Sequence, residues 1–375
     1  MNTTEAIIGR SEINDIEAIL AITNPGSEER ELGVTSTFDS MFTWDYQTAR
    51  PALAKLYAKA KASQWNGATD LDWSTEVDPE QVASTLIINE KSALFSTMDL
   101  AGTPFAKWDL KDWIAYEVQA QNWALSQFTH GEQGALLCTA RVVETVPYLD
   151  AKYYASTQVV DEARHVEVFS RYLNEKLDGM YPINAHLKLL LEDILTDSRW
   201  DMTYLGMQVM VEGLALAAFS FVHQTTSEPL LKKLLRYVMS DEARHVAFGV
   251  LSLQEYYAEL SDAEIKERQE FAFEAAVRMR DRFLQQEVWE RLGLPVKDVV
   301  KLIVDAPERK LFQSILFSKI VPNCKKLGLL DRNDGWLRER FTELGVIHFE
   351  NAVDTGEDYA ELDAVAEDRA LAAAS

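Results

Sequence analysis

The hexapeptide Asp161-Glu162-Ala163-Arg164-His165-Val166 recurs without change as Asp241-Glu242-Ala243-Arg244-His245-Val246. A lone glutamate precedes each copy by 28 intervening residues, Glu132 in the first set and Glu212 in the second. Four carboxylates and two imidazoles are oxygen and nitrogen donors that suit iron or manganese. A four-helix bundle can hold two metals with one Glu from each of two helices and a Glu-x-x-His pair from each of the other two.

The spacing of the two sets fits two helical hairpins of equal depth. Glu and His three residues apart share a helix face, so both can reach one ion. Pro147 lies 15 residues from both glutamates of the first set, and Ser227 lies 15 residues from both glutamates of the second. A turn near each midpoint gives arms of about 22 Å and returns the second glutamate to the height of the first. Apolar residues surround both sets, and buried carboxylates without a cation are costly.

The composition narrows the class of protein. The chain has 375 residues, two cysteines and a formal net charge of −23. Few cysteines and no visible signal peptide predict a reducing compartment, and we expect a cytoplasmic protein. The excess of acid disfavours nucleic acid and anionic membranes as partners. The longest apolar run, residues 213–222, is half of the ~20 residues that span a bilayer, so no membrane segment is expected.

Helical periodicity covers nearly the whole chain, which predicts an all-α protein built on a four-helix bundle with additional flanking helices. We expect an N-terminal helical extension in residues 1–100, the metal-binding bundle in 101–260 and C-terminal helices packed on the bundle in 261–350. The third bundle helix has a weak point at residues 196–198. Residues 351–375 carry seven acidic residues and a single arginine, and we expect this tail to be disordered or a frayed helix.

Residues one turn from the donors, on the inward side, are expected to line a pocket. They are nearly all apolar: Phe128, Ala135, Leu136, Phe169, Leu216 and Phe248. Such a lining fits a partly hydrophobic substrate, or a dry chamber that protects an oxidising species from water. A charged substrate would need a basic anchor outside this ring, and the sequence identifies none.

The paired motifs resemble the ferritin-like diiron-carboxylate superfamily. The Asp-Glu-x-Arg-His form is most similar to the α subunits of bacterial multicomponent monooxygenases, with the p-aminobenzoate N-oxygenases as relatives. The resemblance covers about residues 128–249, and the aromatic segment at 65–73 is weakly similar to these oxygenases too. It implies a ferritin-like bundle with two Fe ions. One ion is held by Glu132, Glu162 and His165, and the other by Glu212, Glu242 and His245.

The resemblance also implies roles for neighbours of the ligands. The aspartates of the repeat would accept the outer N–H of the ligand imidazoles, within or across the hairpins, and the arginines would neutralise these aspartates. These residues are Asp161, Asp241, Arg164 and Arg244. Two further residues match pocket-lining positions of the monooxygenases, Gly131 and Gln158.

Three positions depart from the relatives. Val238 stands where the N-oxygenases carry a third histidine ligand, which disfavours N-oxygenation. Leu216 stands where the monooxygenases carry a threonine that helps to deliver protons. Phe169 occupies the place of the radical tyrosine of ribonucleotide reductase small subunits. The resemblance therefore implies a non-haem diiron monooxygenase or hydroxylase that activates O2 and oxidises a small, partly hydrophobic organic substrate.

Other functions stay open at this point. N-oxygenation of an amine is the first alternative, and a ferroxidase or other metal-handling protein is the second. A scaffold that had lost its metals would lack ligands, whereas all six donors are present. Carboxylate-rich sites also accept manganese at one or both positions. No nucleotide-binding motif is visible, so we expect electrons from a separate reductase or ferredoxin. A homodimer is compatible with the sequence.

Overall fold

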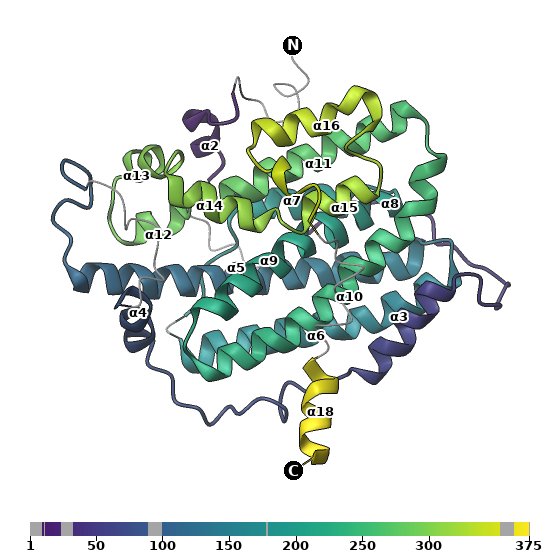
Figure 1. Ribbon diagram of the computed structural model, residues 1–375, viewed down its shortest axis with the longest axis horizontal. Helices are drawn as coiled ribbons and strands as arrows, with labels where there is room; N and C mark the ends of the chain where they lie inside the picture. The colour runs from purple at the N-terminus through teal and green to yellow at the C-terminus, as the bar shows by residue number, and fades with distance from the viewer. Residues whose placement is uncertain are drawn as a thin grey trace.

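The computed structural model describes residues 10, 12–23, 33–88, 100–177, 179–352 and 364–374, and within these ranges it contains helices and loops but no strand. The expected all-α bundle is confirmed. Its arms are α5 (Leu110–Thr145), α6 (Leu149–Lys176), α10 (Pro229–Glu259) and a composite third arm. Figure 1 shows the long helices crossing the middle of the molecule, with the shorter helices around them.

The third arm consists of α8 (Trp200–Tyr204), a π-helix η1 (Leu205–Val211) and α9 (Glu212–Thr225). A break at residues 197–199 separates it from α7 (Ala185–Thr196), next to the weak point expected at 196–198. Glu212 is the first residue after the π-helix. A π-helical turn is rare and frequently lies at a functional site. The sequence pattern did not predict this one.

Local sequence explains the hairpin turns. Pro147 lies in the short connection between α5 and α6, where it cannot continue the helix. At the start of α10, the carboxylate of Glu228 accepts hydrogen bonds from the backbone N–H groups of Leu230 and Leu231, at 2.7 and 2.6 Å. Pro229 occupies the first helical position, where its missing N–H has no partner to lose. Both turns return the chain into the bundle.

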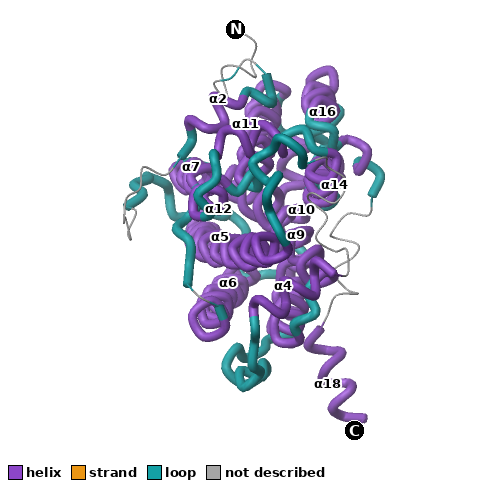
Figure 2. The backbone as a smooth tube through the Cα atoms, turned by 90° about the vertical axis from the view of Figure 1, so that its left-hand side faces the viewer, coloured by secondary structure: helices purple, strands orange, loops and turns teal. Residues whose placement is uncertain are grey.

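The remaining helices pack around the four arms. On the N-terminal side, α3 packs against α6 and α4 against α5, whereas α11 packs against α7 and α16. Figure 2 shows α5 and α6 side by side, with α7 and α11 beyond α5. The bounds of the flanking helices are α2 (Ile16–Ala21), α3 (Pro51–Ala62), α4 (Pro79–Ile88), α11 (Asp262–Arg282), α12 (Gln286–Arg291), α13 (Val296–Ile303), α14 (Pro307–Leu316), α15 (Ile320–Lys326), α16 (Arg332–Glu343) and η2 (Ile347–Phe349).

The last part of the acidic tail, for which we expected disorder or a frayed helix, forms α18 (Ala364–Ala374) at the lower end of the view in Figure 1. Asp368 accepts hydrogen bonds from Arg236 and from the hydroxyl of Tyr237 on α10. Glu367 lies 3.2 Å from Arg236. These contacts with Arg236 and Tyr237 of α10 hold the helix in place. Residues 353–363 of the tail lie outside the described residues.

The apolar stretch of the third arm is longer than the uninterrupted apolar run counted in the sequence. The segment Trp200–Thr225 has a mean hydropathy of 1.7 over 18 residues, enough by length and composition to cross a membrane. However, 78% of that stretch is buried inside the protein. Its apolar character is therefore accounted for by its place in the bundle core. The count of uninterrupted apolar residues missed this length because polar residues such as Gln208 interrupt the run.

Gly249 on α10 lies at a close approach to the π-helix. A Cβ at Gly249 would lie 2.5 Å from the Cβ of Gln208, which cannot move without its backbone. We expect Gly249→Ala to lower the free energy of unfolding by about 1–3 kcal/mol in a urea titration. Gly131→Ala on α5 is the control, because a Cβ there meets nothing within 4 Å. It should raise stability by up to about 1 kcal/mol. Equal effects would contradict the tight packing of η1 on α10.

Candidate metal centre

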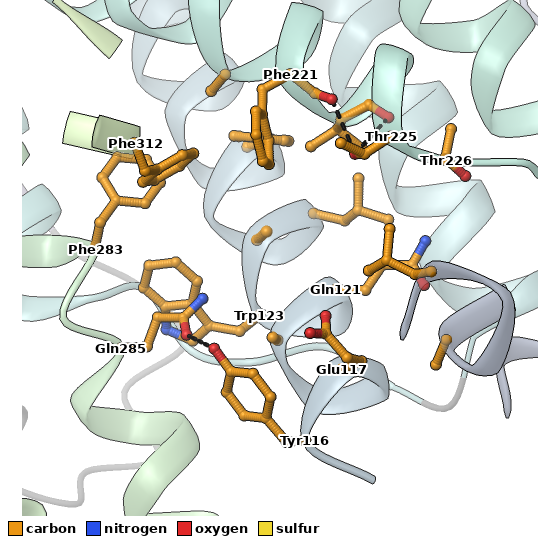
Figure 3. A pocket seen from close by; sticks show the side chains of 18 of the residues that line it. Tyr116, Glu117, Gln121, Trp123, Phe221, Thr225, Thr226, Phe283, Gln285 and Phe312 are labelled. Carbon is orange, nitrogen blue, oxygen red and sulfur yellow. Dashed lines mark hydrogen bonds between the residues drawn. The ribbon is translucent and has the colours of Figure 1, made fainter. Parts of the chain in front are cut away.

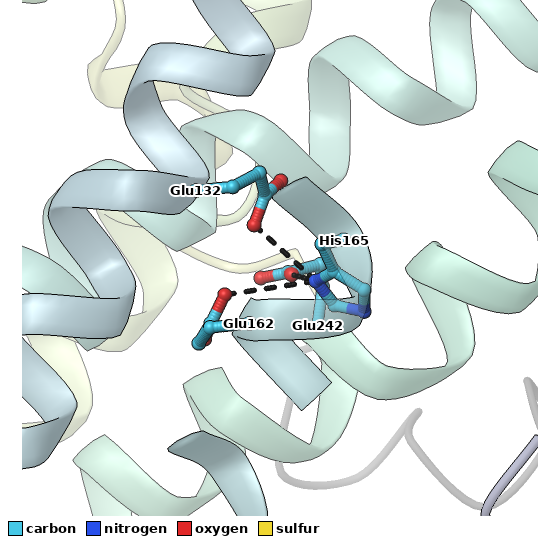
Figure 4. Close-up of side chains that lie close together, drawn as sticks. All are labelled: Glu132, Glu162, His165 and Glu242. Atoms are coloured by element: carbon cyan, nitrogen blue, oxygen red, sulfur yellow. Dashed lines mark hydrogen bonds and ion pairs between the residues drawn. The ribbon is translucent and has the colours of Figure 1, made fainter. Parts of the chain in front are cut away.

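The repeated motifs converge in the middle of the bundle, and each of the four arms contributes at least one side chain. All six side chains are at most 5% exposed: Glu132 from α5, Glu162 and His165 from α6, Glu212 from α9, and Glu242 and His245 from α10. Figure 4 shows the carboxylates of Glu132, Glu162 and Glu242 gathered around the imidazole of His165. Helix periodicity and equal hairpin depth therefore bring together residues that are up to 113 positions apart.

The donors form two overlapping groups. In each group, the ligand atoms lie within 4.8 Å of one another. The first group contains Glu132, Glu162, His165 and Glu242, and the second contains Glu162, Glu212 and His245.

Glu162 and Glu242 lie between the two imidazoles. Oε1 of Glu162 is 3.1 Å from Nδ1 of His245, and its Oε2 is 3.6 Å from Nδ1 of His165. Glu242 mirrors this arrangement, with Oε1 3.1 Å from Nδ1 of His165 and Oε2 3.6 Å from Nδ1 of His245. The resemblance assigned one of these glutamates to each ion. Both glutamates therefore lie between the imidazoles, where residues bridging two ions would lie.

Several of these buried atoms fit a metal because they have no hydrogen-bond partner in the described part of the chain. They are Oε2 of Glu162, Oε2 of Glu212, both carboxylate oxygens of Glu242, and Nδ1 of His245. Buried carboxylates without compensating cations are costly. Carboxylate oxygens with imidazole nitrogens suit iron and manganese. The residues present therefore fit a pair of metal ions.

The pKa shifts of the side chains in the absence of metal also indicate that the cluster needs positive charge to balance its carboxylates. Burial raises the pKa of Glu132 well above its usual value, and Glu242 adds to the effect. Burial and the neighbouring glutamates also raise the pKa of Glu212. Burial opposes the charged form of His165, but hydrogen bonds to Asp241 and Glu132 outweigh it and raise its pKa. Protons thus take the place of cations, and metal binding would release them.

Each ligand imidazole is oriented by an aspartate from the other hairpin. Nε2 of His165 lies 3.1 Å from Oδ2 of Asp241, and Nε2 of His245 lies 3.3 Å from Oδ2 of Asp161. Because Nδ1 of each ring faces the glutamates, the Nε2–H group is the one that donates to the aspartate. Such a partner fixes the tautomer and strengthens the imidazole as a ligand. The contact runs across the hairpins, an alternative that the sequence left open.

The two arginines of the repeat compensate the aspartates. Arg164 donates to Asp161 and, at 3.1 Å, to Asp241. Arg244 donates to Asp241 and, at 2.9 Å, to the carbonyl of Ser240. The negative charge behind each imidazole is thereby balanced inside the protein.

Two residues that sequence reasoning did not assign complete this arrangement. Trp65, in the loop after α3, donates its Nε1–H to Oδ2 of Asp241 at 2.8 Å. Gln64 donates to Oδ1 of Asp161 at 2.8 Å. The ring of Trp65 also stacks on Tyr237, with centroids 5.0 Å apart. The weak aromatic similarity at 65–73 was the only signal, because no spacing rule links this loop to the repeats.

Gln158 lies one turn before Glu162 and is completely buried. Its Nε2 donates to Oε1 of Glu162 and to Oε1 of Glu212, at 2.9 Å each. It therefore holds two carboxylates of the second donor group together, rather than lining a pocket.

A small cavity, called here the metal-side cavity, borders the donors on the side of α5 and α9 and has a volume of about 20 Å³. Three of the expected pocket residues line it, Phe128, Gly131 and Ala135. The other four do not. Phe169, Leu216 and Phe248 are buried in the core and Leu136 is partly buried. The predicted pocket residues therefore border a cavity on one side of the donors only. On the other side, aromatic packing such as that of Phe248 on Tyr154 fills the space.

A second cavity of about 300 Å³, called here the apolar cavity, lies between α4, α5, α9 and α14. Apolar and aromatic side chains form most of its wall, and Figure 3 shows the rings of Phe221, Phe283 and Phe312 grouped on one side of it. Phe128 lines both this cavity and the metal-side cavity. Sequence reasoning missed the apolar cavity because its walls combine parts of α5 and α9 that lie outside the motifs with residues of the flanking helices α4 and α14.

Comparison with known proteins adds a family and a fold. A family model described as p-aminobenzoate N-oxygenase AurF matches residues 140–328, half of the chain. None of the curated proteins matches. Among solved structures, a mutant R2-like ligand-binding oxidase with an anaerobically reconstituted Mn/Fe cofactor is 19% identical, with a TM-score of 0.50 over 76% of this chain and 95% of that chain. A second mutant of such an oxidase is also 19% identical over the same shares, with a TM-score of 0.47. The first similarity shows a shared ferritin-like fold.

The shared position of Glu162 predicts unequal effects of ligand substitutions. We expect Glu162→Gln to remove nearly all bound metal, whereas Glu212→Gln should retain one of the two ions, because Glu212 belongs to one donor group only. Elemental analysis after iron loading under reducing conditions measures this. Glu167→Gln, at an exposed position of α6, is the control and should keep the full metal content. Equal loss in both ligand variants, with helical circular dichroism unchanged, would contradict the bridging position.

The contact of Trp65 with Asp241 predicts that a residue outside the ligand set affects metal affinity. Trp65→Phe removes the N–H donor, so Asp241 holds His165 less firmly. We expect metal affinity to fall by about tenfold, the lower end for partners of ligand side chains. Competition with a chelator measures it. Trp73→Phe is the matched control, since Nε1 of Trp73 donates to the carbonyl of Gly67 and not to the centre. The same loss in both variants would assign the effect to the loop.

Proposed function

The chain belongs to the p-aminobenzoate N-oxygenase AurF family, and from this premise we propose that its two-metal centre uses O2 to hydroxylate or otherwise oxidise a small, partly hydrophobic organic substrate. Membership of this family makes the chain an oxygen-dependent oxidoreductase. One observation carries the proposal: buried, partly orphaned carboxylates and imidazoles lie beside a cavity. A mainly apolar chamber next to such a centre supports an organic substrate.

The residues of the centre have separable tasks. Two ions bound by the six donors would supply the reduction of O2 and the oxidising power. Asp161 and Asp241 keep Nδ1 of each imidazole directed at the glutamates. Gln158 fixes the separation of Glu162 from Glu212. Phe128 and its aromatic neighbours keep bulk water away from the donors, which protects a reactive centre.

Oxidation at carbon is preferred to N-oxygenation in this proposal. Val238, one turn before Glu242, is completely buried and has no donor atom, so a third histidine ligand is absent from that position. The family name supports N-oxygenation of an amine as the second candidate. A ferroxidase is disfavoured because iron turnover has no use for an apolar cavity of about 300 Å³ that shares Phe128 with the cavity bordering the donors.

The proposal includes a partner and a compartment. Electrons would come from a separate reductase or ferredoxin. Both thiols, Cys138 and Cys324, are free and buried, which is compatible with the expected cytoplasmic location. A homodimer stays an expectation from the sequence.

Oxygen uptake by the iron-loaded, reduced protein tests the proposal. We expect rapid uptake on mixing with O2, and incorporation of labelled oxygen into an aromatic acid or amine supplied with it. Mass spectrometry of the product separates attack at carbon from attack at nitrogen. Glu162→Gln should abolish the uptake. Oxygen uptake that yields only ferric mineral would contradict the oxygenase function and support a ferroxidase. Uptake that is unchanged in Glu162→Gln would exclude this centre as the reaction site.

A further inference from the structure

A second repeat, Tyr-x3-Gln-x3-Glu, leads to the centre along two of the arms and lies 50 positions apart in the chain. Its two copies are Tyr154, Gln158 and Glu162 on α6, and Tyr204, Gln208 and Glu212 on the third arm. Residues four apart share a helix face, so each copy forms a row that ends at a metal donor. All six side chains are at most 2% exposed. We call the two copies the α6 row and the third-arm row.

The two rows run in the same direction and lie at the same level of the bundle. At the donor end, Nε2 of Gln158 donates to the terminal glutamates of both rows, at 2.9 Å each. At the other end, the rings of Tyr154 and Tyr204 both pack on Phe248 of α10, with centroids 4.3 and 5.1 Å away. The rows therefore face each other across the bundle core over about 12 Å, the rise of eight helical residues.

Several polar atoms of the rows lack a partner within the chain. Among the described residues, no hydrogen bond is made by the hydroxyl of Tyr154, by Oε1 of Gln158 or by either amide atom of Gln208. An unsatisfied buried polar group costs about 1–3 kcal/mol, and a methionine would fill the place of a glutamine without that cost. Because such groups recur in both rows, we expect them to have partners from outside the chain. Ordered water is the usual partner of buried hydroxyls and amides.

The tyrosine end of the rows reaches the surface layer where α6 and α8 begin. Tyr148, directly before α6, and Trp200, the first residue of α8, are partly exposed, with ring centroids 5.9 Å apart. Trp200 also packs against Tyr204, with centroids 5.6 Å apart. Burial raises the pKa of Tyr204, although the nearby hydroxyl of Ser252 opposes this shift. Tyr204 therefore keeps its proton at neutral pH, and its phenol can both donate and accept a hydrogen bond.

Oxygen chemistry at the centre needs a route for protons. Insertion of one oxygen atom of O2 into a C–H bond consumes two electrons and two protons, and it releases the second oxygen atom as water. The electrons would come from the separate donor of the proposed function, whereas the protons have to come from bulk water. The six donors are at most 5% exposed, so the protons must cross the protein interior. Leu216 stands where the resemblance to the monooxygenases implies a threonine that helps to deliver them.

We propose that the α6 row and the third-arm row, with water bound between their hydroxyls and amides, conduct protons from the surface layer at Tyr148 to the donor end at Glu212. Each hydroxyl or water passes one proton on as it receives another, so no group of the route keeps an added charge. Gln208 is a positioning residue, because its amide holds the water and does not itself transfer a proton. This inference rests on the proposed function, since it supplies the protons of that reaction.

Substitution of Gln208 tests the route by kinetics. Gln208→Met keeps the size of the side chain and removes the amide. We expect the O2 reaction of the iron-loaded, reduced protein to slow by about 100-fold, the lower end for loss of a positioned proton transfer. The solvent deuterium isotope effect should rise, because proton delivery then limits the rate. Gln208→Asn, which retains an amide, should recover part of the rate.

Two outcomes of this experiment overturn the route. One is a slower reaction with an unchanged solvent isotope effect, or no change in either quantity. The other is loss of bound metal in Gln208→Met, measured by elemental analysis, because Gln208 would then support the donors themselves. Full metal content with a raised isotope effect supports the route.

A matched pair of tyrosine variants separates the route from core packing. Tyr204→Phe removes a hydroxyl of the third-arm row. Tyr257→Phe is the control, since Tyr257 is a buried tyrosine of α10 that lies outside both rows, twelve positions after His245. We expect Tyr204→Phe to raise the solvent isotope effect and Tyr257→Phe to leave the rate and the isotope effect unchanged. Equal effects of the two substitutions would assign the change to packing and overturn the route.

A crystal structure of the full chain without metal tests the hydration without turnover. We expect ordered water within hydrogen-bonding distance of the Tyr154 hydroxyl and of the Gln208 amide, and loss of the latter water in Gln208→Met. Rows without bound water overturn the route, whatever the oxygen chemistry shows. No O2 uptake by the unsubstituted protein, with the waters in place, would contradict the proposed function instead. Failure of the route and failure of the proposed function are therefore distinguishable.

Discussion

The structure depends on one electrostatic constraint: four carboxylates and two imidazoles must share the apolar interior of a helical bundle. Such charges can stay buried only if cations or protons balance them and every free lone pair has a partner. The arms are matched in depth because the donors must meet at one level. The π-helix η1 ends directly before Glu212, so the irregular turn lies next to the ligand residue of the third arm.

The same constraint organises the residues behind the donors. Positive charge from Arg164 and Arg244 balances the aspartates, and the indole of Trp65 and the amide of Gln64 donate to the same carboxylate oxygens that Arg164 contacts. Every charge in this layer therefore has a partner within the chain. Arg282 lines the metal-side cavity on the open side of the donors, and its Nε has no hydrogen-bond partner in the described part of the chain.

The sequence was sufficient for the parts of the structure that obey local rules. Helix periodicity, the turn at Pro147 and the Glu-x-x-His spacing predicted the bundle and the convergence of all six donors. The contact of Trp65 with Asp241 joins residues 176 positions apart and follows no helical periodicity, so it could not be predicted from the sequence. The open side of the pocket also escaped prediction. It depends on how aromatic rings such as Phe248 fill space, which residue type alone does not determine.

The crossed aspartates have a consequence for how this chain can vary. Asp161 orients the histidine of the second repeat, and Asp241 orients that of the first. A substitution of either aspartate therefore affects the imidazole of the other copy, and neither hairpin contains all the residues that would hold and orient the ligands of one ion. The aspartate and the histidine of each hexapeptide are therefore both tied to the other copy. The two copies of the repeat therefore function as one structural unit.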